Sequence, residues 1–261
     1  MLAPFEAPKL KIDRAKKHIQ EIETYAASFF ASKPFRLVVE PWELNEQCGF
    51  HSHAWVVRIS NNLSPDISVI IGDVFHNLRA SLDILACDLV RLAGKNTKGV
   101  YFPFCENESG LADMIKHRKI DRAGPETVAM IKELQPYRGG NDWLRAIHDM
   151  NILDKHQALV PVVAGGATPA ATIAFTPEAP TNVPSVRSKI DRDGQCLLVM
   201  PPIANLPVGT ELEAEWHIIF GEDAGPLTGH DVVEALKSLT RLTARIVEFF
   251  AERLQQPERG P

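Results

Sequence analysis

The sequence predicts an α+β fold, because helical and strand-like patterns occupy different parts of the chain rather than alternating along it. Helical periodicity dominates residues 1–158, whereas residues 159–222 are rich in Pro, Gly, Thr and Val and alternate as strands do. A strongly amphipathic helix follows at 230–254. The chain has 261 residues, of which 45% are hydrophobic, so it can bury a sizeable core. We therefore expect a single α+β domain over 1–261.

The chain is expected to begin with a helix and two strands. Apolar residues recur at helical spacing from about Leu10 to Phe30, and Pro34 ends this pattern. Residues 35–40 and 53–59 then alternate as the strands of an antiparallel sheet.

The first of two expected central helices covers about residues 65–93. Ser64 is expected to cap it, Pro65 to occupy its first position and Gly94 to end it. At about 100° per residue, six apolar residues share one core face: Val74, Phe75, Leu78, Leu82, Leu85 and Leu89. A second sector, expected to meet water, holds Asp73, Asn77, Asp88 and Arg91. A third sector holds Gly72, His76, Arg79 and Asp83 among small and apolar neighbours, so it is expected to pack against another segment.

The second central helix covers about residues 142–155, with Asn141 or Asp142 as its cap. Asp154 projects toward its apolar face if the helix extends that far, and an unpaired carboxylate there would be costly. The simplest resolution is a contact between Asp154 and Arg79 or His76 across the interface of the two helices. Asn151 lies at the edge of the same face, and His117 and His148 look like solvated helix residues.

The C-terminal part is expected to contain strands and one long helix. Asp193-Gly194 predicts a hairpin between strands at 186–190 and 195–200, and another strand lies within 211–220. The helix at 230–254 carries a single apolar stripe that could cover the core or form a homodimer. Its members are Val232, Leu236, Leu239, Thr243, Ile246 and Phe250.

The polar residues of the two central helices form the candidate site. The candidate catalytic residues are His76, Arg79, Asp83 and Asp154. His76 would transfer protons near neutral pH, Arg79 would hold an anionic group with its planar fork, and either carboxylate would orient the histidine. The candidate ligand-binding residues are Asn77, Asn151, Lys155 and His156. The alternative is a buried ion-pair network that only fixes the packing of the helices.

Composition restricts the partners and the location. The net charge of −5 makes nucleic acid an improbable partner, and no apolar run is long enough to cross a bilayer. The four cysteines form no CxxC pair, and no apolar leader follows the N-terminus, so a cytoplasmic protein with reduced thiols is expected. No motif predicts a cofactor or a metal site; a small anionic ligand is the expected partner.

Two motifs carry a resemblance to a known group of proteins. They are Gly72-Asp73-x-x-His76-Asn77-Leu78-Arg79-x-x-Leu82-Asp83 and Leu153-Asp154-Lys155-His156, with Leu134-Gln135-Pro136-Tyr137 between them. Together they resemble a group of uncharacterised bacterial proteins over residues 10–160, a likeness that implies kinship without an activity. A more distant likeness is to HEPN-type helical ribonucleases, which set an Arg-(polar)-x(4–6)-His motif on a helix. Here Ala80 follows Arg79 and no histidine stands at the required distance, so RNA cleavage is the lesser hypothesis.

Three classes of function follow from the sequence. The first is an enzyme, a hydrolase or nuclease-like protein that uses His76 with Arg79. The second is a binding module for a small anionic ligand. The third is a structural or interaction protein in which the polar network serves packing alone. The first two predict a site open to solvent, and the third predicts closed packing in which every polar atom is paired.

Overall fold

The α+β fold class is confirmed by the structure, a computed structural model. It describes residues 2–42, 52–156, 159, 161–167, 189–190, 196–199, 211–212 and 214–254. The chain divides into two compact units. The first contains Met1–Thr24, Pro65–Val162 and Ile218–Pro261, and the second contains Tyr25–Ser64 and Val163–His217. The expectation of a single domain over 1–261 stays a prediction.

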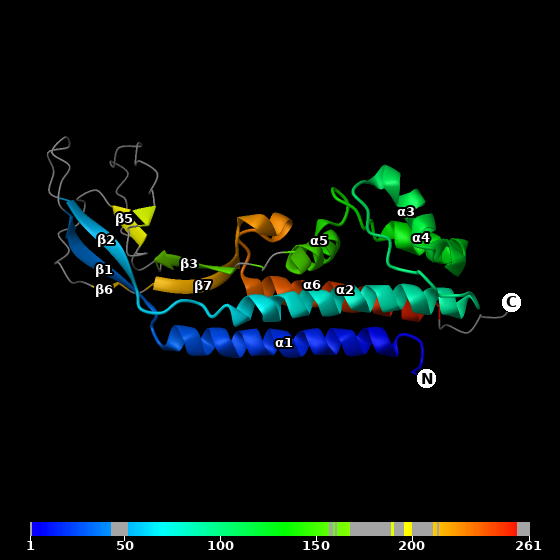
Figure 1. Cartoon of the computed structure of the whole chain (residues 1–261), viewed down its shortest axis with the longest axis horizontal. Helices are drawn as coiled ribbons and strands as arrows, with labels where there is room; N and C mark the ends of the chain where they lie inside the picture. The colour runs from blue at the N-terminus through cyan, green and yellow to red at the C-terminus, as the bar shows by residue number, and fades with distance from the viewer. Residues whose placement is uncertain are drawn as a thin grey trace. The chain divides into compact units, whose positions relative to one another are not determined.

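The first unit is mainly helical (Figure 1). Its long helices are α1 (Glu6–Ala31), whose last residues belong to the second unit, α2 (Asp66–Leu92), α5 (Asp142–His156) and α6 (Val232–Leu254). The shorter elements are η1 (Glu108–Gly110), α3 (Leu111–His117), η2 (Ile120–Ala123), α4 (Pro125–Glu133) and η3 (Glu222–Leu227).

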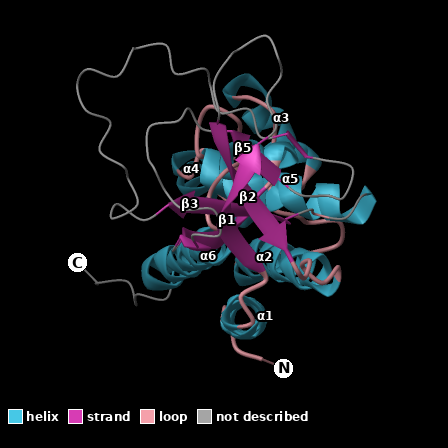
Figure 2. Ribbon diagram, turned by 90° about the vertical axis from the view of Figure 1, so that its left-hand side faces the viewer, coloured by secondary structure: helices cyan, strands magenta, loops and turns pink. Residues whose placement is uncertain are grey.

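Helix α2 is the centre of the first unit, because α5, α6 and η2 all pack against it. Figures 1 and 2 show α1 on the side of α2 that faces away from α5. The six residues of the predicted core face of α2 are all buried, with exposed fractions of 1% or less. The apolar stripe of α6 is buried as well, so it packs within the molecule rather than remaining free for a second copy.

Helix α1 covers a sector of α2 that was expected to meet water. Asp73 and Arg91 are exposed as predicted, but Asn77 and Asp88 are buried, which corrects half of that expectation. Asp88 accepts a hydrogen bond from the backbone N–H of Phe5 at 3.0 Å. These contacts give α2 a third covered side, in addition to the two that the sequence predicted.

The ends of the two central helices follow from local chemistry. The structure places the N-cap of α2 at Pro65, so Ser64 lies one residue before the N-cap position that was predicted for it. Gly94 adopts a φ of +69° just after the helix, as a C-terminal glycine does. Asn141 caps α5 by accepting a hydrogen bond from the N–H of Leu144 at 3.0 Å. Helix α5 extends to His156 and therefore includes Asp154.

The second unit holds an antiparallel sheet in the order β4-β5-β2-β1-β6. Its strands are β1 (Phe35–Trp42), β2 (Ser52–Ile59), β4 (Lys189–Ile190), β5 (Cys196–Val199) and β6 (Glu211–Leu212). The predicted pairing of the segments before and after Asp193-Gly194 is confirmed by β4 and β5, although the turn itself lies outside the described residues. A separate two-stranded sheet joins β3 (Pro161–Ala167) and β7 (Ala214–Phe220).

Among the helices that the structure describes, none combines the length and the apolar character needed to cross a bilayer.

Candidate functional site

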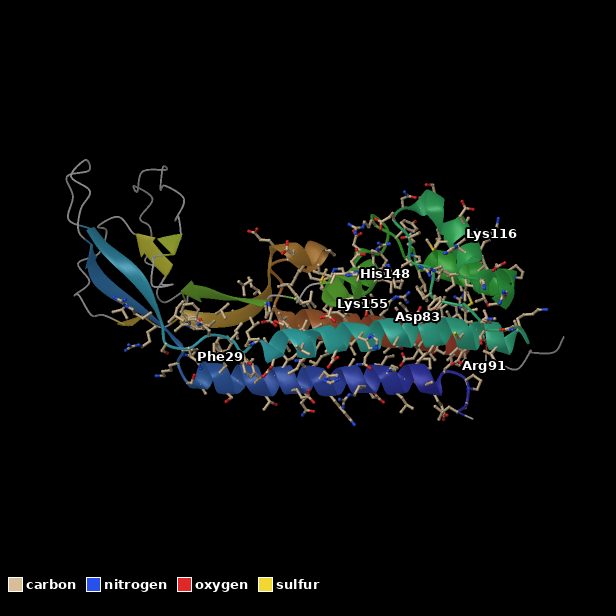
Figure 3. The ribbon with its side chains drawn as sticks, in the orientation of Figure 1. Phe29, Asp83, Arg91, Lys116, His148 and Lys155 are labelled. Atoms are coloured by element: carbon tan, nitrogen blue, oxygen red, sulfur yellow. The ribbon has the colours of Figure 1, made fainter. Side chains whose placement is uncertain are left out.

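The interface between α2 and α5 brings the two sequence motifs together, as the sequence predicted. Figure 3 labels Asp83 on α2 and His148 and Lys155 on α5. Asp154 lies against Gly72, and His148 lies against Arg79. Because these contacts occur in reverse order along the two helices, the interface contains two polar groups at different levels. One group surrounds Gly72 and the other surrounds Arg79.

The first group is built on a glycine in the middle of a helix. A Cβ atom on Gly72 would lie 2.1 Å from Oδ1 of Asp154 and 2.4 Å from its Cγ, so only glycine leaves room for this carboxylate. Glycine inside a helix costs about 1 kcal/mol relative to alanine. The close approach of Asp154 to the α2 backbone is a specific reason for accepting that cost.

The Asp154 carboxyl has a pKa raised above its ordinary value. Burial is the largest cause, and the negative charge of Asp73 acts in the same direction. His76 and Lys155 oppose the shift with positive charge. His76 therefore lies near enough to influence the Asp154 carboxyl by its charge, but no hydrogen bond or ion pair joins these two residues, and the predicted contact between them stays a prediction. No hydrogen bond joins the Asp154 carboxylate to a residue in the described part of the chain.

Asn151 is the second unsatisfied group at this level. Its side chain is only 5% exposed, yet it forms no hydrogen bond with any residue that the structure describes. Since no fully enclosed side-chain N or O in the described ranges lacks a partner, the Asn151 amide opens to solvent. It lies one helical turn before Asp154 on α5, and the exposed His76 lies one turn after Gly72 on α2. These four residues define what we call the Gly72 site.

The remaining predicted ligand-binding residues are placed differently. Lys155 and His156 are exposed in the last turn of α5, and Lys155 adds positive charge near Asp154. Asn77 does not join the Gly72 site, because it lies on the α1 side of α2. Its amide donates to the carbonyl of Asp73 at 2.7 Å, and its oxygen accepts from Nζ of Lys11 at 3.5 Å.

Arg79 and Asp83 form the second group, which is closed. The Arg79 guanidinium donates to Asp83 at 2.5 Å, to Nδ1 of His148 at 3.3 Å and to the carbonyl of Phe102 at 3.4 Å. Its Cζ also lies 4.7 Å from the centre of the Phe104 ring. Asp83 in turn accepts the Phe102 N–H at 2.8 Å. Each nitrogen of the Arg79 guanidinium thus has a partner, and neither Arg79 nor Asp83 forms a hydrogen bond or an ion pair with His76 or Asp154.

His148 belongs to this closed group, so the expectation that it is solvated is wrong. Its ring stacks on Phe104 with centroids 5.0 Å apart and an interplanar angle of 8°. Burial, followed by the positive charges of Arg79 and Arg145, lowers the pKa of His148 to about 3. The imidazole is therefore neutral at physiological pH, with Nδ1 as the acceptor for Arg79.

A third polar group lies at the start of α5 and was not identified from the sequence. Arg145 is 5% exposed and binds Asp149 at 2.9 Å and Glu106 at 2.5 Å. It also donates to the carbonyl of Cys105. Arg138 bridges the same two carboxylates from outside, at 2.9 and 3.1 Å. The Arg145–Asp149 spacing of four residues was the available signal, but the partner in the 102–106 segment is not visible in sequence.

The part of the chain that the structure describes contains no group of three or more His, Cys, Asp or Glu side chains arranged to hold a metal ion. Asp73, His76 and Asp154 therefore interact through their charges but do not form a set of metal ligands.

Comparison of the chain with models of known protein families, with curated proteins and with solved structures gave no match. The resemblance to the bacterial group and the distant likeness to HEPN-type ribonucleases therefore stay predictions.

We expect Arg79→Met to lower the free energy of unfolding by about 3 kcal/mol, because removing one partner of a buried ion pair leaves the other uncompensated. Urea titration followed by circular dichroism measures the change. The matched control is Arg241→Met on the exposed side of α6, which should change stability by less than about 0.5 kcal/mol. A loss as small as that of the control would show that the Arg79 network contributes little to folding.

His148 should make the protein sensitive to acid. The pKa of His148 in the folded protein, about 3, lies below the ordinary value of 6.5. Between these two values the unfolded chain binds a proton that the folded protein does not bind. The stability contributed by the neutral ring is complete above pH 6.5 and is lost as the pH falls toward 3. One proton gives at most about 1.4 kcal/mol per pH unit, and less here because the ring is partly exposed.

His148→Gln keeps an acceptor for Arg79 and removes the titrating group, so it should flatten the fall in stability between pH 6 and pH 4. Thermal unfolding at each pH measures the slope. His117→Gln on the exposed side of α3 is the control and should leave the slope unchanged. An unchanged slope in His148→Gln would contradict the assignment of a neutral buried ring.

The charge neighbours of Asp154 predict how its carboxyl titrates. Asp73→Asn should lower the pKa of Asp154, because a negative neighbour disappears. His76→Gln should raise it, because an opposing positive charge disappears. Carbon-detected NMR titration of the Asp154 carboxyl measures both shifts, and Asp113→Asn, an exposed carboxylate on α3, is the control. Shifts of the opposite signs, or none, would refute the proximity of the three groups.

Proposed function

We propose that the protein is a hydrolase in which His76 and Asp154 form the acid–base pair at the Gly72 site. The observation that carries this proposal is the Asp154 carboxylate, which lies on the bare backbone of Gly72 with a raised pKa and without a hydrogen-bond partner in the described part of the chain. The carboxylate is only partly buried, and shifted pKa values of this kind are concentrated at functional sites.

The contrast between the two levels of the interface supports a site rather than packing alone. Each of the three guanidinium nitrogens of Arg79 donates a hydrogen bond within the protein, which is the closed arrangement that a structural role predicts. Around Gly72, three groups of different chemistry stay unpaired within the described ranges: the His76 imidazole, the Asn151 amide and the Asp154 carboxylate. This is the open arrangement that an active or binding site predicts.

The proposed chemistry uses each group according to its environment. The exposed imidazole of His76 takes a proton from a water molecule, whose oxygen attacks the electrophilic centre of the substrate. The bond to the leaving group then breaks, and the imidazolium returns the proton to that group. Asp154 stabilises the imidazolium with its negative charge, and the Asn151 amide donates a hydrogen bond to the substrate oxygen.

The charge of the site disfavours the alternative of an anion-binding module at the same place. Arg79, the residue expected to hold an anion, has its donors committed to Asp83, His148 and Phe102. Asp73 and Asp154 place negative charge at the Gly72 site, with Lys155 as the nearest opposing cation besides His76. A neutral polar substrate therefore fits this site better than an anion does. The free thiols of Cys87 and Cys105 fit the cytoplasmic location that we include in the proposal.

A panel of chromogenic carboxylic and phosphoric esters and amides tests the proposal. We expect turnover of at least one class by the wild-type protein. His76→Ala and Asp154→Asn should each reduce kcat/KM by about 10²- to 10⁴-fold, as loss of an acid–base group does. Gly72→Ala should also reduce it, because the new Cβ takes the place of the Asp154 carboxylate while alanine favours the helix.

His117→Ala is the matched control, since His117 is an exposed histidine on another helix, and it should leave kcat/KM unchanged. Circular dichroism of each variant separates a lost activity from a lost fold. Turnover that survives both His76→Ala and Asp154→Asn, or no turnover of any class by the wild type, would contradict the hydrolase proposal. Binding without turnover that requires Asn151 would instead identify a binding module.

A further inference from the structure

We infer that the protein has a second site, on the far side of the α2 C-terminus from the Gly72 site, that binds a small ligand carrying a phosphoryl or pyrophosphoryl group. A pocket of about 320 Å³ is lined there by Lys95, Asn96, Lys98, Lys119 and Arg122. Four of these five side chains are cationic, and none is acidic. We call it the Lys119 pocket.

The backbone around the pocket is held by specific local bonds. The N–H of Lys95 donates to the carbonyl of Val90 at 3.1 Å, which closes the end of α2 and turns the chain away. The Asn96 side chain then accepts the N–H of Lys98 at 2.7 Å. These bonds fix the backbone positions from which the Lys95 and Lys98 side chains extend.

Lys119 enters the pocket from the opposite segment, over a glycine. A Cβ atom on Gly99 would lie 2.9 Å from Nζ of Lys119, so the bare backbone of Gly99 leaves the path of the lysine open. Lys119 itself has a φ of +58°, a left-handed conformation that is uncommon for a side chain of this size. A strained backbone and a glycine thus combine to place one ammonium group beside the loop.

The cations of the pocket have no counter-ion in the described part of the chain. Nζ of Lys119 donates to the carbonyl of Lys98 at 3.3 Å, and Nη1 of Arg122 donates to the carbonyl of Asn96 at 2.8 Å. Neither these two residues nor Lys95 and Lys98 form an ion pair with a described carboxylate. Asp121, the acid nearest in sequence, is exposed and does not line the pocket.

Four like charges in one pocket repel one another, and this is unusual in a chain whose net charge is −5. A polyvalent anion removes that repulsion. Ammonium and guanidinium groups with free N–H donors match phosphate oxygens in both charge and geometry. The small, concave pocket fits one or two phosphoryl groups of a compact ligand rather than an extended polymer.

Isothermal titration of the 261-residue chain with sodium pyrophosphate, and separately with inorganic phosphate, at low ionic strength tests this inference. We expect saturable binding of pyrophosphate that weakens with added salt, and weaker binding of phosphate. Lys119→Met combined with Arg122→Met should weaken pyrophosphate binding at least roughly tenfold, because two charge-assisted contacts are lost. The matched control pairs Lys17→Met with Lys132→Met, two exposed lysines on α1 and α4, and should leave the affinity within about twofold.

A second variant, Lys95→Met with Lys98→Met, changes only exposed side chains of the loop and protects the test against a folding defect at Lys119. It should also weaken binding. Absence of pyrophosphate binding at millimolar concentrations, or equal binding by the wild type and both variants, would overturn the inference. Anionic phospholipid vesicles and a single-stranded oligonucleotide are tested in parallel. If either binds through these residues while pyrophosphate does not, the small-ligand assignment is wrong.

Discussion

The Arg79–Asp83 pair is the interaction on which the arrangement of the helical unit depends. Arg79 leaves the central helix α2 and reaches two other segments, His148 on α5 and the backbone and ring at 102–104. Burial of the guanidinium lowers its pKa, and the partner carboxylate of Asp83 is the main opposing influence. A buried cation of this kind is tolerated because each of its three nitrogens donates a hydrogen bond and the Phe104 ring lies against it. One side chain thereby fixes the position of α5 on α2.

That closed pair also determines where unpaired polar groups can exist. With α5 held at His148, the next turns of the same helix carry Asn151 and Asp154 to the level of Gly72, where no described arginine forms an ion pair with the Asp154 carboxylate. The carboxylate remains next to Asp73, and its proton affinity rises. A rigid, satisfied network beside an unsatisfied one is the arrangement expected when a scaffold holds reactive groups in position. We therefore assign the structural role to the residues around Arg79 and propose the functional role for those around Gly72.

Periodicity predicted the elements and their buried faces because it depends on local geometry alone. The core face of α2 and the stripe of α6 are buried residue for residue as expected. Periodicity does not show which segment of the chain packs over a given face of a helix. The local pattern predicts Asn77 and Asp88 on a solvated face because it contains no sign that α1 packs over them. The prediction of a solvated His148 fails for the same reason, since its partner ring, Phe104, lies 44 residues away in an irregular segment. Whether His76 or Arg79 is the neighbour of Asp154 depends on how far α5 is shifted along α2. A helical wheel, which shows only the angular positions on one helix, does not contain that information.

The Gly72 site contains residues of α2 and the Lys119 pocket lies beyond the C-terminal end of that helix, so we expect the two proposed sites to act on separate ligands. From His76 to Leu92, the last residue of α2, the helix rises about 24 Å at 1.5 Å per residue, and the Lys119 pocket lies beyond that end. A compact phosphorylated ligand in a 320 Å³ pocket does not span this distance, so its phosphate is not the group attacked at the Gly72 site. The electrostatics agree, because cations without counter-ions surround one site and two carboxylates flank the other. If the sites influence each other, the coupling has to pass through α2 and the Arg79 network between them, since no ligand bridges them.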